Sequence, residues 1–374
     1  MINYTLENYE DKLTRQVIHM DQAICYCPEF RATKMMHDYP SRKLQMARAV
    51  YKNELEPNEY ISDLLFQSIL SRQGERWQNF GESPEDCTDV MILSREMMLS
   101  KGFGKHIVDK FKSTLNKNNG HILKIQDKDI NRFKRYIPVS DKSTTYLFID
   151  DATCTYAGKS ARNIGEFFSK NGVTFYPEIK ATFAGWEYFA YGLVEEGKEY
   201  IKKMLDDLES KGIDTIMTLS GQTQYLFKIY IKKLGLENEI KVESILDYVD
   251  ELKVDTPAYL YAGSFYSRYL RMEDKINSLV KNTREQYISN CAEFNPLIDG
   301  DKRVNEVTIW QKPVTAEYKL FGFDENILNN IVEDGICDIK KGIQNITIVF
   351  DPYEYKVISE KMGSSSVVYF AELL

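Results

Sequence analysis

Cysteine is scarce in this sequence of 374 residues. There are six, at positions 25, 27, 87, 154, 291 and 337, which is too few and too scattered for the disulfide framework of a small secreted protein. The closest pair, Cys25 and Cys27, has one residue between its members, whereas common zinc and redox motifs separate their cysteines by two. The sequence therefore predicts thiols without a disulfide role.

The chain also lacks long apolar runs and an excess of positive charge. No run approaches the ~20 apolar residues that cross a bilayer, and the polar, acidic start has no secretory pattern. A net charge of −8 argues against a nucleic-acid surface, which needs clustered positive charge. The four histidines, at positions 19, 37, 106 and 121, have no metal-binding spacing, so no zinc site is expected at them. These absences predict a cytoplasmic protein that neither spans a membrane nor binds nucleic acid.

The chain has ample material for a folded core. Hydrophobic residues make up 43% of it and aromatic residues 13%, the balance of a globular protein with more than one domain. Apolar spacing predicts helices over residues 42–51, 59–70 and 89–99. No strand pattern precedes about residue 144, and residues 121–140 are interpreted as a connector. The first part of the chain is therefore expected to be all-helical.

Strands and helices alternate beyond this connector. Short apolar runs predict strands over 145–149, 173–176 and 213–219. Helices are expected over 158–170, 195–210 and 222–234, the second with Ile201, Leu205 and Leu208 on one face, and residues 243–252 close the unit. This alternation predicts an α/β layered fold.

The same order of elements recurs in the last third of the chain. A strand is expected over 258–261 and a helix over 271–280, followed by an irregular middle. Residues 345–350 then mirror 215–219, and residues 367–374 echo 242–249. We therefore predict an internal duplication, with domains at 1–140, 141–252 and 253–374.

Several short segments follow a recognisable pattern. Residues 183–186 read Phe-Ala-Gly-Trp, residues 218–223 read Thr-Leu-Ser-Gly-Gln-Thr, and residues 263–271 begin with Gly-Ser-Phe-Tyr. With the repeat, these segments make the chain resemble the iron–sulfur subunits of heterodisulfide reductase and of glycolate or lactate oxidases. That family has a helical ferredoxin-like domain and two cysteine-rich domains with a Cys-Cys-Gly motif. The resemblance implies an N-terminal all-α ferredoxin-like domain followed by two similar α/β repeats.

The resemblance also implies where the cluster cysteines would stand in the two repeats. Other residue types occupy these positions. In the first repeat, Phe183 and Ala184 stand in place of the Cys-Cys pair, and Ser220 and Thr223 stand in place of a Cys-x-x-Cys turn. Asp351 and Glu354 stand in the corresponding turn of the second repeat, and Asp151 stands in place of a further ligand near the first strand.

The helical part shows the same loss. Cys27-Pro28 resembles the end of a first cluster motif, whose earlier positions hold Val17, Met20 and Ala23. A second motif would end at Ser83-Pro84, and its earlier positions hold Gln73, Arg76 and Asn79. One cysteine of eight survives. Since hydroxyls and apolar side chains cannot replace thiolates around iron, no iron–sulfur cluster is expected.

Our leading hypothesis is a cluster-less homologue, a pseudoenzyme that acts as a structural or regulatory subunit of a redox complex. Its expected partner is a cluster-bearing relative or a flavoprotein. A second hypothesis is a repurposed cleft between the repeats, in which Asp150, Asp151, Asp351 and Glu354 bind a small molecule or a hard cation, although such carboxylates also cap helices. A third is an electron-transfer subunit with a nonstandard cluster held through cysteines 25, 27 and 87.

Overall fold

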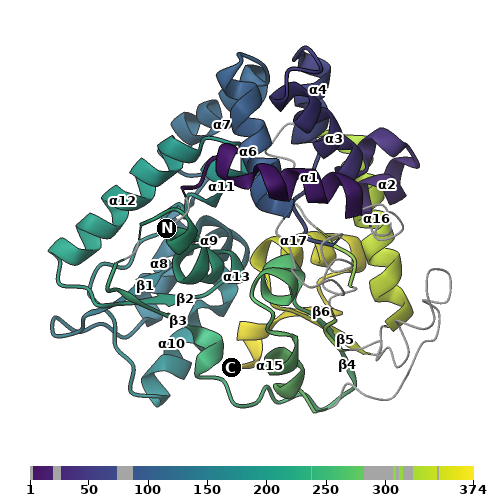
Figure 1. The fold of residues 1–374 in the computed structure, drawn as a ribbon. Helices are drawn as coiled ribbons and strands as arrows, with labels where there is room; N and C mark the ends of the chain where they lie inside the picture. Colours follow the sequence, from purple (N-terminus) through teal and green to yellow (C-terminus); the bar gives the residue numbers. More distant parts are fainter. Residues whose placement is uncertain are drawn as a thin grey trace.

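The computed structural model describes residues 3–19, 27–73, 87–236, 238–281, 306–308, 311–314, 323–342 and 345–374. Within these ranges the fold is α/β, with helices and two three-stranded parallel sheets. Both sheets lie side by side beneath a layer of helices from the N-terminal part of the chain (Figure 1). No helix in the described ranges is long and apolar enough to span a bilayer.

The described residues before 140 contain helices and no strand. These elements are η1 (Glu7–Tyr9), α1 (Glu10–His19), α2 (Pro28–Thr33), η3 (Met36–Asp38), α3 (Pro40–Tyr51), α4 (Glu59–Phe66), α6 (Cys87–Ser100), α7 (Lys105–Lys117) and α8 (Asp127–Tyr136). Helix α8 corrects the expectation of a connector over 121–140. It buries Phe133 and packs on α10, and this tertiary packing stabilises a helix whose other residues are mostly polar.

The first sheet has the order β1-β2-β3, with β2 at its centre. Its unit, which we call the first sheet unit, comprises β1 (Thr145–Phe148), α9 (Asp151–Tyr156), η4 (Gly158–Ser160), α10 (Ala161–Lys170), α11 (Trp186–Ala190), α12 (Val194–Ser210), β2 (Thr215–Thr218), α13 (Gly221–Tyr225), η5 (Leu226–Tyr230), α14 (Ile231–Lys233), β3 (Lys241–Ser244) and η6 (Ile245–Asp247). The strand expected over 173–176 was wrong, because only a single bridge between Phe175 and Val139 forms there.

The second sheet has the order β4-β5-β6, again parallel and with its middle strand second in sequence. Its unit, the second sheet unit, comprises β4 (Ala258–Tyr261), η7 (Phe265–Tyr269), α15 (Glu273–Ser278), α16 (Glu325–Gly342), β5 (Ile346–Val349), α17 (Pro352–Met362), β6 (Val367–Tyr369) and η10 (Phe370–Leu373). Helix α16 corrects the expectation of an irregular middle. It buries Leu328, Ile331, Val332, Ile336 and Ile339 at helical spacing.

The two cores follow from the alternation of side chains along the strands. In the first sheet, Tyr146 and Phe148 face a core shared with α11, α12 and the N-terminal helices. Leu147 and Met217 face the opposite core, which includes residues of α8, α10 and the second sheet unit. Successive residues of a strand point to opposite faces, so a four-residue strand such as β1 contributes to both cores.

Two buried arginines connect the helical layer to the sheet units. Arg95 on α6 donates to the carbonyl oxygens of Leu65, Ser68 and Ala190. Arg268 on η7 donates to the carbonyl oxygen of Ser71 at 2.6 Å, and also to Gln311 and Ser264. The guanidinium fork satisfies several acceptors at once. The loop after α4 is therefore fixed from both sides.

Candidate functional site

The site begins where strands end. Asp150, Ser220 and Asp351 each come five residues after the first residue of β1, β2 and β5. Each is the N-cap of the helix that follows: the Asp150 carboxylate accepts from the Thr153 backbone N–H at 2.8 Å, and Asp351 accepts from the Tyr353 N–H at 2.9 Å. A capping side chain satisfies a backbone donor that the helix leaves unpaired. These residues thus have a structural role before any other.

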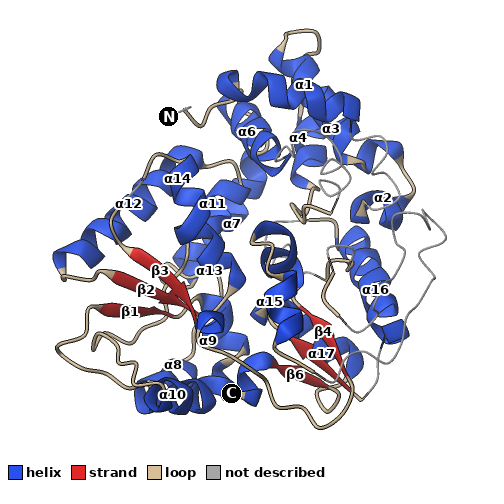
Figure 2. Cartoon of the chain, turned by 60° about the horizontal axis from the view of Figure 1, so that its bottom comes forward, coloured by secondary structure: helices blue, strands red, loops and turns tan. Residues whose placement is uncertain are grey.

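The strand ends of the two units face each other. Helix α9 contacts α17, with the rings of Tyr156 and Tyr353 5.8 Å apart, and α13 contacts η7. The Tyr369 hydroxyl, from the end of β6, donates to the carbonyl oxygen of Leu219 at 3.4 Å. Figure 2 shows the two sheets on either side of this boundary. The carboxyl ends of both sheets therefore meet in the protein interior, where open α/β sheets place their ligands.

Buried carboxyl groups gather at this boundary, which we call the inter-unit face. Burial, opposed by hydrogen bonds from the Glu354 and Tyr353 backbone and reinforced by the charge of Asp150, raises the pKa of Asp351 to about 7. Burial also raises the pKa of Asp150. For Glu187, on α11, burial and the charges of Asp151 and Asp150 raise the pKa to about 8. Near neutral pH, Asp351 and Glu187 therefore keep protons that exposed carboxyl groups would release.

The carboxylate of Asp151 is hydrogen-bonded to a different segment of the chain. Its carboxylate accepts from the Ile122 backbone N–H at 2.7 Å and lies 2.7 Å from Nδ1 of His121. The bond to Asp151 raises the pKa of His121. Asp151 therefore anchors the segment before α8.

Glu354 lies against the backbone of the second unit. A Cβ atom built on Gly263 would stand 2.0 Å from Oε2 of Glu354 and 2.9 Å from Cβ of Asp351, and φ of Gly263 is +79°. Only glycine tolerates this conformation and this contact. In the described part of the chain, the four carboxylates predicted for a repurposed cleft, at positions 150, 151, 351 and 354, do not supply three ligand atoms close enough to share one ion.

The positions that resemble cluster ligands in the first unit are closed by packing. Phe183 and Ala184 are each 3% exposed. The Phe183 ring lies 5.6 Å from the ring of Tyr200 and 6.3 Å from that of Phe111, centroid to centroid. The hydroxyls of Ser220 and Thr223 are hydrogen-bonded to each other at 2.9 Å. Aromatic contacts thus surround Phe183, and the hydroxyls of Ser220 and Thr223 are partners of each other.

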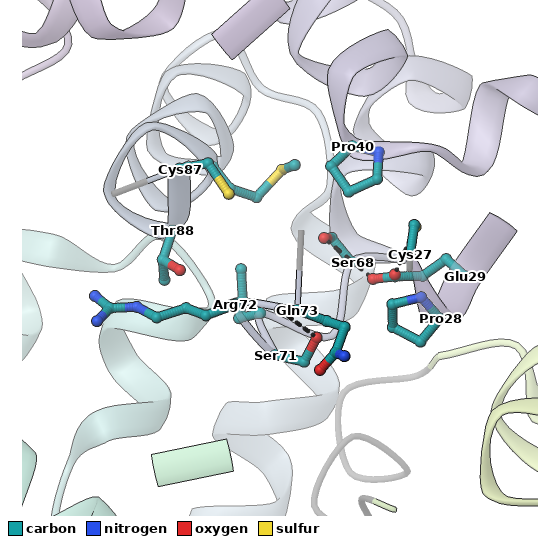
Figure 3. Close-up of a pocket in the computed structure, with 12 residues that line it drawn as sticks. Cys27, Pro28, Glu29, Pro40, Ser68, Ser71, Arg72, Gln73, Cys87 and Thr88 are labelled. Atoms are coloured by element: carbon teal, nitrogen blue, oxygen red, sulfur yellow. Dashed lines mark hydrogen bonds between the residues drawn. The ribbon is translucent and has the colours of Figure 1, made fainter. Parts of the chain in front are cut away.

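A small cavity lies under the helical layer (Figure 3). Its volume is about 30 Å³, and its walls include Cys27, Cys87, Ser71, Arg72 and Gln73. A volume of this size holds one or two water molecules.

The Cys27 thiol is committed to local hydrogen bonds. It donates to Oε2 of Glu29 at 3.2 Å and accepts from the Phe30 backbone N–H, which makes it the N-cap of α2. Burial and the charge of Glu29 raise the pKa of this thiol well above its usual range. Since the thiolate is the form that binds metals, Cys27 is a poor ligand here.

Some predicted positions lie outside the described residues or lack a described side chain. These are Val17, Met20, Ala23, Cys25, Arg76, Asn79 and Ser83.

The sequence prediction missed two kinds of residue. Glu187 was not singled out, because a single glutamate in a helix is usually solvated; its only signal is its place between Trp186 and two aromatic residues. The buried Arg95 and Arg268 were also missed as connectors, since their acceptors are carbonyl oxygens that no sequence pattern marks.

Comparison with known proteins adds one relative. The chain is 21% identical over 289 residues to the uncharacterized protein YMR130W of Saccharomyces cerevisiae, an alignment that covers 75% of this chain and 78% of that protein. No family model matches the chain, and no solved structure matches it.

Proposed function

We propose that this chain is a cluster-less homologue of the heterodisulfide reductase-type iron–sulfur subunits, and that it serves as a structural or regulatory subunit of a redox complex. The observation that carries the proposal is the chemistry of the residues at the cluster positions. Phe183 and Ala184 have no donor atom, and Ser220 and Thr223 bond to each other. These residues do not fit an iron–sulfur cluster, which needs thiolates.

The proposed duplication is supported by the register of the two sheets. In both units the central strand pairs in parallel with the first, residue for residue, from Thr145 with Thr215 and from Ala258 with Ile346. The contacts between the units are reciprocal. Helix α9, which follows β1, contacts α17, which follows β5, and η7, which follows β4, contacts α13, which follows β2. A pseudo-twofold pair of repeats behind a helical domain accounts for this arrangement.

The proposed partner interface is on the helical layer. Met35, Met36 and Tyr60 are 51%, 45% and 59% exposed, and the Tyr60 ring lies 6.5 Å from that of His37. Exposed apolar side chains of this kind are typical of protein interfaces. The proposed partner is a cluster-bearing relative or a flavoprotein, in the cytoplasm.

The first test is the iron and acid-labile sulfide content of protein purified without oxygen from its native host. We expect a folded, colourless protein without sulfide. Stoichiometric iron and sulfide would overturn the proposal and return the chain to the electron-transfer proteins.

The partner is tested by copurification with the full chain. We expect a cluster-bearing or flavin-containing protein, and we expect Tyr60→Ser to weaken its recovery. Val139→Ser is the matched control, because Val139 is also an exposed hydrophobic residue, 49% exposed, but lies away from the helical layer, between α8 and β1. Recovery of chaperones alone would count against a redox complex.

A second candidate function is binding of a small molecule at the inter-unit face. The observation in its favour is the raised pKa of Asp351, about 7, and of Glu187, about 8, since strongly shifted carboxyl groups concentrate at functional sites. The test is the melting temperature of the protein in panels of nucleotides, thiol cofactors and divalent cations. A rise that Asp351→Asn abolishes would favour this candidate, and no rise with any compound would eliminate it.

A further inference from the structure

Two helices of the helical layer bring a histidine against two carboxylates, in a place that none of the preceding sites includes. Glu59 and Asp63 are four residues apart on α4 and therefore share one face of that helix. His106 is the second residue of α7. One ligand atom from each of the three side chains lies within 4.8 Å of the other two. The side chains are 55%, 47% and 51% exposed, so an ion from solvent can reach them.

The backbone at Gly104 fixes this arrangement. Gly104 precedes α7 with φ +79°, and a Cβ atom there would stand 2.4 Å from Oγ of Ser62 and 2.9 Å from the Phe66 ring. Glycine thus lets the chain pass directly against α4, which places His106 beside Asp63. The Gly104 backbone N–H also donates to Oε2 of Glu59 at 2.9 Å, which orients that carboxylate.

One separation is close to that between ligands of one ion: Nε2 of His106 lies 3.2 Å from Oδ1 of Asp63. The Oε2 atom of Glu59 lies 3.8 Å from the other ring nitrogen, Nδ1. An imidazole binds one ion through one nitrogen, and with one atom taken from each side chain the three ligand atoms lie within 4.8 Å of one another. With metal–ligand bonds of about 2.0–2.2 Å, neighbouring ligands of a tetrahedral ion are roughly 3.4 Å apart. Oδ1 of Asp63 has this imidazole as its neighbour and makes no aligned hydrogen bond within the described residues.

The charge of the cluster also favours a cation. Two carboxylates and one imidazole carry about two negative charges when the imidazole is neutral. Burial, with the charge of Glu59, raises the pKa of Asp63, whereas His106 and Lys110 lower it. Lys110 is thus the basic group that would compete with a bound ion. One imidazole with two carboxylates suits a borderline divalent ion such as Zn²⁺.

We propose that Glu59, Asp63 and His106 form a binding site for a borderline divalent cation. Three protein ligands leave a fourth position for water or for a side chain of a partner. The site would hold the start of α7 on α4.

The test is titration of the chelator-treated full chain with Zn²⁺ by calorimetry, and with Co²⁺ by absorption. We expect one saturable site whose Co²⁺ spectrum lacks thiolate charge-transfer bands, which separates it from binding to cysteines. His106→Ala and Asp63→Asn should each weaken Zn²⁺ binding at least tenfold. His37→Ala is the matched control. Within the described residues the ion-pair partner of His37 is Asp38, at 3.5 Å, so this variant should bind Zn²⁺ as tightly as the parent does.

A second readout guards against unfolded variants. Zn²⁺ should raise the melting temperature of the parent but not of His106→Ala, while both melt alike in chelator. Absence of saturable binding, or equal affinity in His106→Ala and the parent, would reduce the cluster to a surface ion pair. Iron bound here would bring no acid-labile sulfide, so the sulfide measurement tests the proposed function independently.

Discussion

Glu187 offers a direct test of the buried charge at the inter-unit face. Burial raises its pKa from 4.5 to about 8, so the folded protein keeps a proton that the unfolded chain releases above about pH 4.5. Stability then falls as pH rises, because the folded state binds more protons than the unfolded state in this window. We expect Glu187→Gln, which has the same shape and no charge, to remove this loss.

The magnitude follows from proton linkage. A carboxyl group that is protonated in the folded state but ionised in the unfolded state lowers the free energy of unfolding by roughly 1 kcal/mol for each unit of pH. Between pH 5 and pH 8, Glu187 therefore accounts for a loss on the order of a few kcal/mol. Glu187→Gln should match the parent near pH 5 and exceed it at pH 8. A smaller slope remains up to about pH 7, because Asp351 has a pKa of about 7.

The assay is urea unfolding followed by tryptophan fluorescence from pH 5 to pH 8.5. Glu199→Gln is the matched control, since it makes the same charge change at an exposed position of α12, and it should keep the slope of the parent. If Glu187→Gln shows the same pH slope as Glu199→Gln, the carboxyl of Glu187 is not protonated by burial and the reasoning is refuted.

Three further predictions concern packing and thiol chemistry. Phe183→Ala should lower the free energy of unfolding by about 3–5 kcal/mol, measured in urea, because the ring is buried among aromatic residues; a loss below 1 kcal/mol would contradict close packing there. Arg268→Ala should cost about 3 kcal/mol in the same assay, because three acceptors lose a charged donor, and Arg268→Lys should not restore it. Alkylation mapped by mass spectrometry should modify the exposed Cys337 rapidly and the buried Cys27 and Cys154 only after unfolding; fast native labelling of Cys27 would contradict its buried N-cap role.

The sequence predicts elements well where a local pattern decides the structure. The apolar run at residues 145–149 is observed as β1, and the helix expected over 195–210 is observed as α12, with Ile201 and Leu205 on its buried face. Strand β3 is different. Its sequence, Lys-Val-Glu-Ser, is short and largely polar, and pairing with β2 makes it a strand. Such elements depend on tertiary contacts that a local pattern does not contain.

The candidate sites depend even more on contacts between distant segments. The strand-end positions of Asp150 and Asp351 were predictable, since parallel strands end at one edge of a sheet. That the two edges face each other, and that Glu187 joins them from α11, follows from the packing of the units. Likewise, Glu59 and Asp63 have visible helical spacing, but His106 arrives from another helix.

The inter-unit face is asymmetric in a way that couples its residues. By strand position Asp150 corresponds to Gly263, and Ser220 corresponds to Asp351. The first unit thus has a carboxylate after its first strand and a hydroxyl after its second, whereas the second unit has a glycine and then a carboxylate. The absence of a side chain at Gly263 leaves the space that Glu354 occupies. Because each unit places one cap carboxyl group where the other has a smaller residue, the buried face contains two such carboxyl groups rather than four, and the desolvation cost of the boundary is correspondingly lower.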